Sequence, residues 1–247
     1  MSATDVFTHE SEIRNTIRSK PALTMLYREF YGYYLEMISK CPPKGLLVEL
    51  GSGAGFAKEI VPNLITTDIL DYQGVDRVVD AAAMPFDNKS VSFIGMTNVF
   101  HHLTDVSRFL HEADRVLIPN GRTLMIDQHN GIISRPVLRY LHHEPYNTAA
   151  RTWALTSSGS SPGANGALAW IVFKRDLPVF EENFPRLKLI SYQTHTPLRY
   201  WLCGGLRRWN ALPACAYRPV CRLERLLLSI SENFGSFCNV EIIKEAS

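Results

Sequence analysis

The sequence predicts an α/β fold in which a mostly parallel sheet carries helices on both faces. Short apolar runs, typical of buried strands, alternate along the chain with segments whose apolar residues recur at helical spacing. Hydrophobic residues make up 46% of the 247 residues and charged residues 20%, which excludes an intrinsically disordered chain.

Seven segments are expected to be strands. The first, 46–50, runs directly into a glycine-rich turn, and the second, 64–68, ends in an aspartate. A weaker segment covers 75–79. The remaining strands are expected at 91–96, 123–127, 187–193 and 237–243.

Two longer helices are expected. Apolar residues at helical spacing predict one over 22–39, which ends before Pro42 because a residue that precedes proline leaves the helical region. Another begins after 104–105, with 119–121 (Pro-Asn-Gly) as its stop. Shorter helices are expected over 56–61 and from near Pro136.

We expect one domain rather than two. Its parts are an N-terminal helical cover (1–43), a binding core (44–127), a first insertion (128–185), and the last strands (186–247), which enclose a second insertion over 195–235.

Several targeting and redox features favour a cytoplasmic protein. No stretch approaches the ~18 apolar residues of a spanning helix. The N-terminus carries Asp5, Glu10 and Glu12 without an apolar core, so no secretory signal is expected. Five cysteines, an odd number, indicate reduced thiols, and the absence of a C-x-x-C pair argues against a zinc site, so no bound metal is expected.

The glycine turn after the first strand is the most informative motif. Gly51, Gly53 and Gly55 let the backbone approach a ligand closely. Their G-x-G-x-G spacing departs from the dinucleotide pattern, because Phe56 stands where its last glycine belongs. Glu49 would repel a diphosphate but suits a cation such as an α-amino group or a sulfonium. These features disfavour a nicotinamide dehydrogenase.

Residues 49–55 resemble motif I of class I S-adenosylmethionine-dependent methyltransferases. Asp68, 17 residues after Gly51, matches the acid that holds the ribose hydroxyls in that family. Three later segments resemble further motifs in the family's order: 80–86 the D-A-x-x-L-P-F segment, 98–103 the segment after strand four of the type-11, quinone-biosynthesis-like subgroup, and 117–121 its L-x-P-G-G turn with Asn120 for the first glycine.

The resemblance implies a doubly wound, Rossmann-like sheet of seven mostly parallel strands and S-adenosyl-L-methionine as the cofactor. In this family the glycines shape the cofactor turn, Glu49 would face the methionine end, and Asp80 with Ala81 would frame the adenine. The residues expected to bind the cofactor are Glu49, Gly51, Ser52, Gly53, Gly55, Asp68, Ile69, Asp80, Ala81 and Asn98.

Three histidines are candidate catalytic bases: His101, His102 and His129. Each follows a predicted strand at its carboxyl end, where open α/β sheets bind ligands, and imidazole titrates near neutral pH. Asp127 would orient His129, bind a substrate cation or cap the next segment. A second cluster, 142–144 (His-His-Glu), could be joined with His129 and Asp127 into a metal site, but we expect a substrate-pocket contact there instead.

The second insertion has an unusual composition. Residues 195–230 carry six arginines against one glutamate, a net charge of +5, although the whole chain carries +2. Tyrosines, tryptophans and leucines are interleaved with these arginines. The segment could be a lid over a phosphate-bearing substrate, a peripheral contact with an anionic membrane through 198–225, a homodimer interface, or a solvated helical hairpin. No nucleic-acid partner is expected. The Gly/Ser-rich stretch 156–166 is a candidate mobile lid.

The preferred function is O-methylation of a small-molecule or lipid- or nucleotide-linked glycan-type acceptor, by a cytoplasmic or peripherally membrane-bound enzyme. The alternatives are N- or C-methylation of another metabolite, and a cofactor-binding partner protein without turnover. A general base is required only where the nucleophile must lose a proton.

Overall fold

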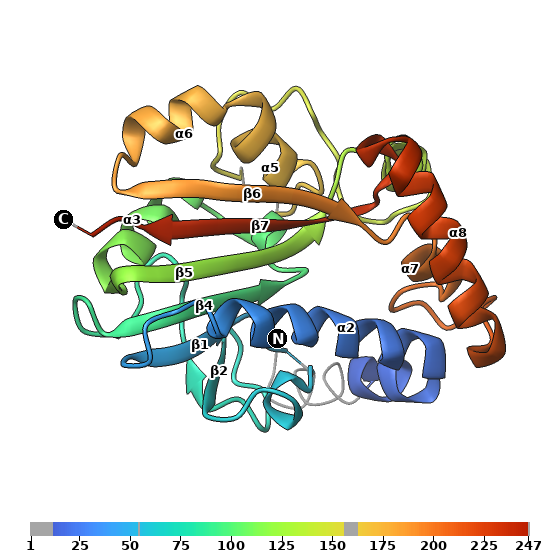
Figure 1. Ribbon diagram of the computed structural model, residues 1–247, viewed down its shortest axis with the longest axis horizontal. Coiled ribbons are helices and arrows are strands. Elements are labelled where there is room, and N and C mark those ends of the chain that lie inside the picture. The colour runs from blue at the N-terminus through green and yellow to red at the C-terminus, as the bar shows by residue number, and fades with distance from the viewer. Residues whose placement is uncertain (1–11, 54, 156–162, 247) are drawn as a thin grey trace.

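The computed structural model describes residues 12–53, 55–155 and 163–246, and its centre is a seven-stranded sheet (Figure 1). The strands are β1 (Leu46–Leu50), β2 (Leu64–Asp68), β3 (Arg77–Val78), β4 (Val91–Thr97), β5 (Leu117–Gln128), β6 (Leu187–His195) and β7 (Phe237–Lys244).

The strand order is β3-β2-β1-β4-β5-β7-β6. Neighbours from β3 to β5 pair in parallel, whereas β7 is antiparallel to both β5 and β6. This arrangement confirms the predicted Rossmann-like, seven-stranded, mostly parallel sheet. Every residue of β4 except Thr97 is buried, as expected for a central strand that helices cover on both faces.

The helices and helical turns are α2 (Pro21–Ile38), η1 (Ala57–Glu59), η2 (Phe100–His102), α3 (Val106–Val116), α4 (Ser134–Tyr140), α5 (Leu168–Trp170), η3 (Ile171–Arg175), α6 (Leu177–Asn183), α7 (Arg199–Leu202), η4 (Ala214–Ala216), α8 (Tyr217–Ile230) and η5 (Glu232–Phe234). One face of the sheet packs against α3, α5, η3 and α6, and the other against α2, η1, α7 and the start of α8.

Two sequence-based predictions need correction. Residues 56–61 do not form a full helix, because only the three-residue 3₁₀ turn η1 follows the glycine loop. The Pro-Asn-Gly segment 119–121 does not stop α3, which ends at Val116, but lies inside the long strand β5. Asn120 adopts a left-handed conformation there, with φ of 63°, and this lets the strand continue through the irregularity.

Helix α2 covers the glycine loop. The Tyr31 ring packs edge-on against Phe56, with ring centroids 5.2 Å apart. A methyl group at Gly55 would lie only 2.6 Å from Tyr31 Oη, so glycine is required for this close approach. The predicted helix over 22–39 therefore closes one side of the loop.

Both insertions leave the sheet from the same edge. The last residue of β5, Gln128, pairs with Phe237 at the start of β7, and so does His195, the last residue of β6. The carboxyl ends of β1, β2 and β4 lie at this edge as well, because these strands are parallel to β5. In Figure 1, α7 and α8 stand beyond the tip of β5.

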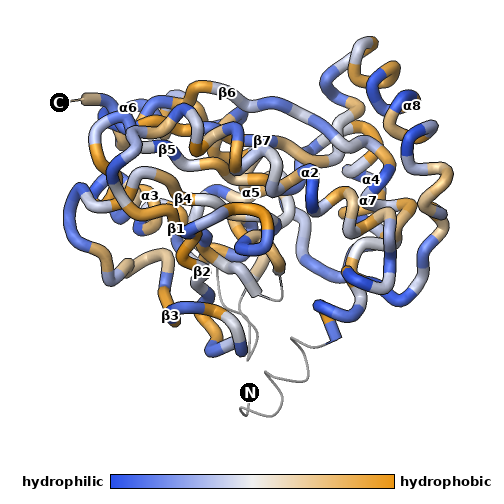
Figure 2. The backbone as a smooth tube through the Cα atoms, turned by 60° about the horizontal axis from the view of Figure 1, so that its bottom comes forward, coloured by the Kyte–Doolittle hydropathy of each residue, from blue (hydrophilic) through white to orange (hydrophobic). Residues whose placement is uncertain are grey.

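No helix within the described ranges is both long enough and apolar enough to cross a membrane. In Figure 2, hydrophilic and hydrophobic stretches alternate along α8 at the side of the molecule.

Candidate active site

The glycine turn after β1 leaves open space beside its backbone. Gly51 has φ of +70°, and a Cβ atom there would meet Val99 at 2.4 Å. Gly53 has φ of +47°, but a Cβ atom there would meet only Asp68 Oδ2, at 3.8 Å. Gly51 is therefore required for packing, whereas Gly53 faces free space. Ala54 lies outside the described residues.

Two buried polar atoms at this turn have no hydrogen-bond partner in the described part of the chain: Glu49 Oε2 and Asn98 Nδ2. Burial raises the pKa of Glu49, which is only 2% exposed, to about 7. Asn98 follows β4 in a left-handed conformation with φ of 58°. Unpaired buried polar groups are costly and rare, so these two atoms indicate a place for a polar ligand.

The other predicted cofactor residues line the same edge. Asp68, at the end of β2, accepts hydrogen bonds from the backbone N–H groups of Gly53 at 2.9 Å and Leu70 at 3.0 Å. Burial raises its pKa. Ser52 Oγ accepts a hydrogen bond from the Thr67 backbone, which ties the turn to β2. Ile69 is exposed.

Asp80 and Ala81 lie between β3 and β4. Asp80 Oδ1 accepts a hydrogen bond from the Ala82 backbone N–H at 2.8 Å, which is an Asx turn. Ala81 packs against the buried cluster on the α3 face of the sheet.

His101 is buried between two carboxylates. Its Nδ1 lies 2.7 Å from Asp127 Oδ1 and its Nε2 lies 3.3 Å from Glu144 Oε2. Burial alone would lower the pKa of His101, but the two carboxylates raise it to about 10. Asp127 therefore orients His101 rather than His129. With a pKa of about 10, His101 is already protonated at neutral pH and so does not accept a further proton.

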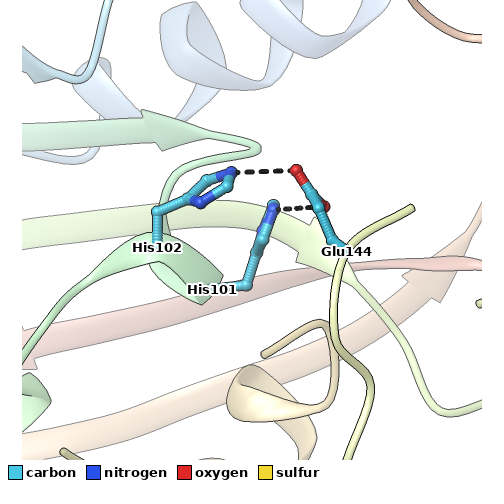
Figure 3. Close-up of side chains that lie close together, drawn as sticks. All are labelled: His101, His102 and Glu144. Atoms are coloured by element: carbon cyan, nitrogen blue, oxygen red, sulfur yellow. Dashed lines mark ion pairs between the residues drawn. The ribbon is translucent and has the colours of Figure 1, made fainter. Parts of the chain in front are cut away.

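His102 shares the same carboxylate and is more accessible. Its Nε2 lies 3.3 Å from Glu144 Oε1, and 41% of its side chain is exposed. The His101 and His102 rings contact each other, with centroids 4.1 Å apart and planes tilted by 40°. Burial alone would raise the pKa of Glu144, but the two imidazoles hold it well below its usual range. Figure 3 shows both rings pointing at this carboxylate.

His129 has different surroundings. It is 4% exposed, and its Nδ1 lies 2.9 Å from Tyr192 Oη. Burial lowers the pKa of His129 to about 4, so the ring is neutral at pH 7. Its Nε2 is buried and finds no partner among the described residues. The three predicted catalytic histidines thus form one pair in contact and one separate residue.

Residues 48–125, which contain the glycine turn, match the family model described as a methyltransferase domain, type 11. The chain carries a type-11 methyltransferase domain. This finding confirms the prediction of a class I S-adenosylmethionine-dependent methyltransferase.

Solved structures of methyltransferases share the fold. Geranyl diphosphate C-methyltransferase from Streptomyces coelicolor, in complex with Mg²⁺, geranyl diphosphate and S-adenosyl-L-homocysteine, has 17% identity and a TM-score of 0.50; the match covers 91% of this chain and 82% of that one. A putative methyltransferase complexed with the Trm112 activator in Haloferax volcanii has 13% identity and the same TM-score, with 95% and 98% covered. No curated protein matches this sequence.

The arginines of the second insertion of the methyltransferase fall into two groups. Arg199 is buried: its Nε lies 2.5 Å from Glu224 Oε2, and its Nη1 lies 2.6 Å from Glu29 Oε2 on α2. This ion-pair network attaches the insertion to the helix that covers the glycine loop. The other arginines of the segment outside the network are exposed: Arg207, Arg208, Arg218, Arg222 and Arg225.

Helix α8 has an exposed face with two parallel stripes. Leu223, Leu226 and Ile230 are 46%, 59% and 69% exposed, and their spacing places them along one line of the helix. The exposed Arg218, Arg222 and Arg225 form the neighbouring line. This face, defined by these six residues, is hereafter called the α8 face.

A polar hollow of about 630 Å³ opens beside the first insertion. Arg135 and Arg139 from α4 line it, together with Asn130 and Tyr146. Asn130 directly follows His129, and Tyr146 comes two residues after Glu144. Chain neighbours of His129 and Glu144 thus line the hollow, and two arginines supply it with cationic side chains.

Sequence reasoning missed two partners. Glu144 was grouped with its neighbours His142 and His143 and not with His101 and His102, which lie more than forty residues earlier. Tyr192 was missed as the partner of His129. Only His101, His102 and His129 were expected at the carboxyl edge of the sheet, whereas the placement of 142–144 in the first insertion was left open. Residues 156–162 of the predicted lid lie outside the described residues.

Proposed function

We propose that the open space at the glycine turn holds S-adenosylmethionine in the orientation that the resemblance implies. Glu49 Oε2 would pair with the α-amino group of the cofactor, and Asp68 would bind the ribose hydroxyls. The unpaired Glu49 and Asn98 atoms and the free space at Gly53 support this assignment. The donor supplies an activated methyl group, and the chain's own residues align the acceptor and exclude water.

Calorimetric titration with S-adenosylmethionine, S-adenosylhomocysteine and NAD in parallel tests the cofactor site. We expect the first two to bind at about micromolar concentration and NAD to show no binding. NAD binding without S-adenosylmethionine binding would contradict the assignment.

We further propose that the acceptor is a hydroxyl of a lipid-linked, phosphate-bearing glycan presented at a membrane surface. The α8 face carries this proposal, because exposed leucines beside arginines are typical of helices that lie in an anionic interface. The arginines of the polar hollow suit a phosphate group. The α8 insertion and the histidine sites belong to the same edge of the sheet.

The proposed chemistry is an in-line displacement. The acceptor oxygen forms a bond to the methyl carbon as the carbon–sulfur bond breaks, and the hydroxyl proton must be lost. The cluster of His101, His102 and Glu144 would assist this loss, and His102 is its accessible histidine. Nitrogen or carbon nucleophiles remain the alternative acceptors.

Vesicle sedimentation tests the membrane contact. We expect the protein to bind phosphatidylglycerol vesicles and not phosphatidylcholine vesicles, and the double variant Leu226→Ser/Ile230→Ser to lose at least about tenfold in affinity. Val179→Ser, which removes an exposed apolar side chain from α6, is the matched control and should bind as the wild type does. A concentration-dependent dimer that Leu226→Ser/Ile230→Ser abolishes, without vesicle binding, would identify the α8 face as a homodimer interface instead.

A methyl-transfer assay tests the acceptor. Lipid-linked glycans and water-soluble sugars are incubated with a labelled donor, and the methylated atom is assigned by NMR. We expect O-methylation of the lipid-linked acceptors. Exclusive N- or C-methylation would overturn the proposed chemistry, and full occupancy of the cofactor site without turnover on any acceptor would favour a non-catalytic partner protein.

We also infer that the chain acts as one domain at the cytoplasmic side of a membrane. Both insertions return to the same sheet, and the Arg199 network joins the second one to α2. Limited proteolysis is expected to show a single protected core.

A further inference from the structure

The cluster of His101, His102 and Glu144 has the composition and spacing of a metal site. The two histidines come from η2, after β4, and Glu144 comes from the segment after α4. One ligand atom from each of the three lies within 4.8 Å of those of the other two. Figure 3 shows the two rings arranged around the carboxylate.

We propose that these three residues bind a divalent transition-metal ion and leave a fourth position open. Two imidazole nitrogens and one carboxylate oxygen form a donor set that suits Zn²⁺ and neighbouring transition metals better than Mg²⁺. Two ligand atoms that are each about 2.1 Å from a tetrahedral zinc ion lie about 3.4 Å apart. Both histidine Nε2 atoms lie 3.3 Å from a Glu144 oxygen, so the existing spacing already suits such an ion.

Asp127 provides the supporting contact that metal-binding histidines need. Asp127 Oδ1 lies 2.7 Å from His101 Nδ1 and accepts a hydrogen bond from the Gln128 backbone N–H at 2.7 Å. Asp127 Oδ2 accepts a hydrogen bond from the His101 backbone N–H at 3.2 Å. A carboxylate held in this way fixes the proton of a neutral His101 on Nδ1, and it leaves the lone pair of Nε2 for the metal.

The Glu144 carboxylate contains a buried oxygen atom, Oε2, that lacks a hydrogen-bond partner of good geometry among the described residues. Of the nearby histidines, His142 places its Nδ1 3.4 Å from Oε2, but this Nδ1 accepts a hydrogen bond from the Glu144 backbone N–H and so does not donate one to Oε2. His143 is largely exposed, with its Nε2 3.8 Å from Oε1. Neither histidine donates a hydrogen bond to Oε2, whereas a cation between the carboxylate and the His101 and His102 rings would bind this oxygen.

The competing explanation is a proton rather than a metal. One protonated histidine would form an ion pair with Glu144, but two protonated rings with centroids 4.1 Å apart would repel each other. A single metal ion satisfies both nitrogen lone pairs and the carboxylate at once. The two explanations predict different numbers of bound metal ions, one or none.

The role of the ion deepens the proposed function and rests on it. An acceptor hydroxyl at the open position would lose its proton to solvent more readily, because a bound cation lowers the pKa of an oxygen ligand. The resulting alkoxide would attack the methyl group, and no oxidation or reduction takes part. Metal binding itself does not depend on the acceptor.

The test uses the full chain, freed of metal with a chelator and titrated with Zn²⁺ or Co²⁺ alone. We expect one equivalent to bind, and the visible absorption of bound Co²⁺ to be that of a four- or five-coordinate site. His102→Ala and Glu144→Gln should each weaken binding at least about 100-fold, since each removes a direct ligand. His143→Ala is the matched control and should bind as the wild type does. Circular dichroism and thermal unfolding check that each variant is folded.

Failure of the wild type to bind Zn²⁺ and Co²⁺ would overturn the proposal, as would equal binding by Glu144→Gln and wild type. The Co²⁺ spectrum needs no variant, so the test stands even if a variant fails to fold. If the metal binds but its removal leaves methyl transfer unchanged, the site stands and its role in acceptor activation is wrong. If the metal binds and no hydroxyl acceptor is methylated, the proposed function fails independently of the site.

Discussion

The segment 46–127 and the two insertions that follow it are organised in opposite ways. In the segment 46–127, each polar residue of interest lies at the end of a strand or in the turn that follows. Its partners are close in sequence or lie on the adjacent strand: Asp68 accepts a hydrogen bond from the Gly53 backbone, and Ser52 accepts one from the Thr67 backbone. In the insertions, the important contacts join residues far apart, such as Glu144 with His102 and Arg199 with Glu29. A local motif therefore describes the first region, and only tertiary contacts define the second.

The same contrast appears among the arginines of the second insertion. The sequence shows one basic segment, yet Arg199 is a buried structural residue and Arg222 is an exposed one. Net charge by itself therefore does not separate the arginine that holds the insertion in place from the arginines that are exposed at the surface.

The largest expected loss of stability tests the difference between the buried Arg199 and the exposed Arg222. Arg199→Ala leaves Glu224, which is 2% exposed, without its cation, and we expect the free energy of unfolding to fall by about 3–5 kcal/mol. Arg222→Ala should change it by less than about 0.5 kcal/mol, because this side chain is exposed. Urea denaturation measures both. Equal losses would mean that burial does not separate the two arginines.

A second prediction concerns the glycine turn. Gly53→Arg would fill the free space beside Asp68, and we expect the affinity for S-adenosylhomocysteine to fall at least about 100-fold, or about 2.7 kcal/mol. Gly53→Ala should lose much less, since its methyl group meets no atom closer than 3.8 Å. Calorimetric titration distinguishes the two variants. Normal binding by folded Gly53→Arg would exclude this turn as the cofactor site.

A third prediction concerns Glu49. Glu49→Gln removes the charge that would pair with the cofactor ammonium, and it should weaken S-adenosylhomocysteine binding about tenfold. Burial raises the pKa of Glu49 to about 7, so the free wild-type protein loses this charge as the pH falls through 7. Affinity should therefore decrease toward acidic pH in the wild type and change little in Glu49→Gln. Parallel pH dependence in the two proteins would rule out Glu49 as the titrating group.

The smallest effect belongs to a local contact in the core segment. Asp105 caps the N-terminus of α3, where its side chain accepts a hydrogen bond from the Arg108 backbone N–H at 3.2 Å. Asp105→Ala should lower the free energy of unfolding by about 1 kcal/mol. Glu182→Ala on α6 removes an exposed acid and serves as the control. Thermal unfolding compares them, and equal stabilities would argue against a capping role.

Read alone, the sequence determines the sheet and the glycine loop. The bounds of β1 and β2 agree with those predicted, because an apolar run of only five residues between turns is too short for a stable helix and satisfies its backbone hydrogen bonds in a buried sheet. At the Pro-Asn-Gly segment, pairing of β5 with β4 overrode the local stop signal, because both strand portions that flank the segment pair with β4. The segment after Phe56 formed only η1.

The tertiary structure alone decided which residues share a site. Asp127 precedes His129 by two residues, but β5 ends at Gln128, so His129 no longer follows the strand geometry. The turn after β4 instead brings His101 to the Asp127 carboxylate. Glu144 reaches the same histidine because the first insertion folds back over the carboxyl edge of the sheet. Spacing in the sequence encodes contacts along a strand or helix, whereas contacts between insertions depend on the packing of the whole chain.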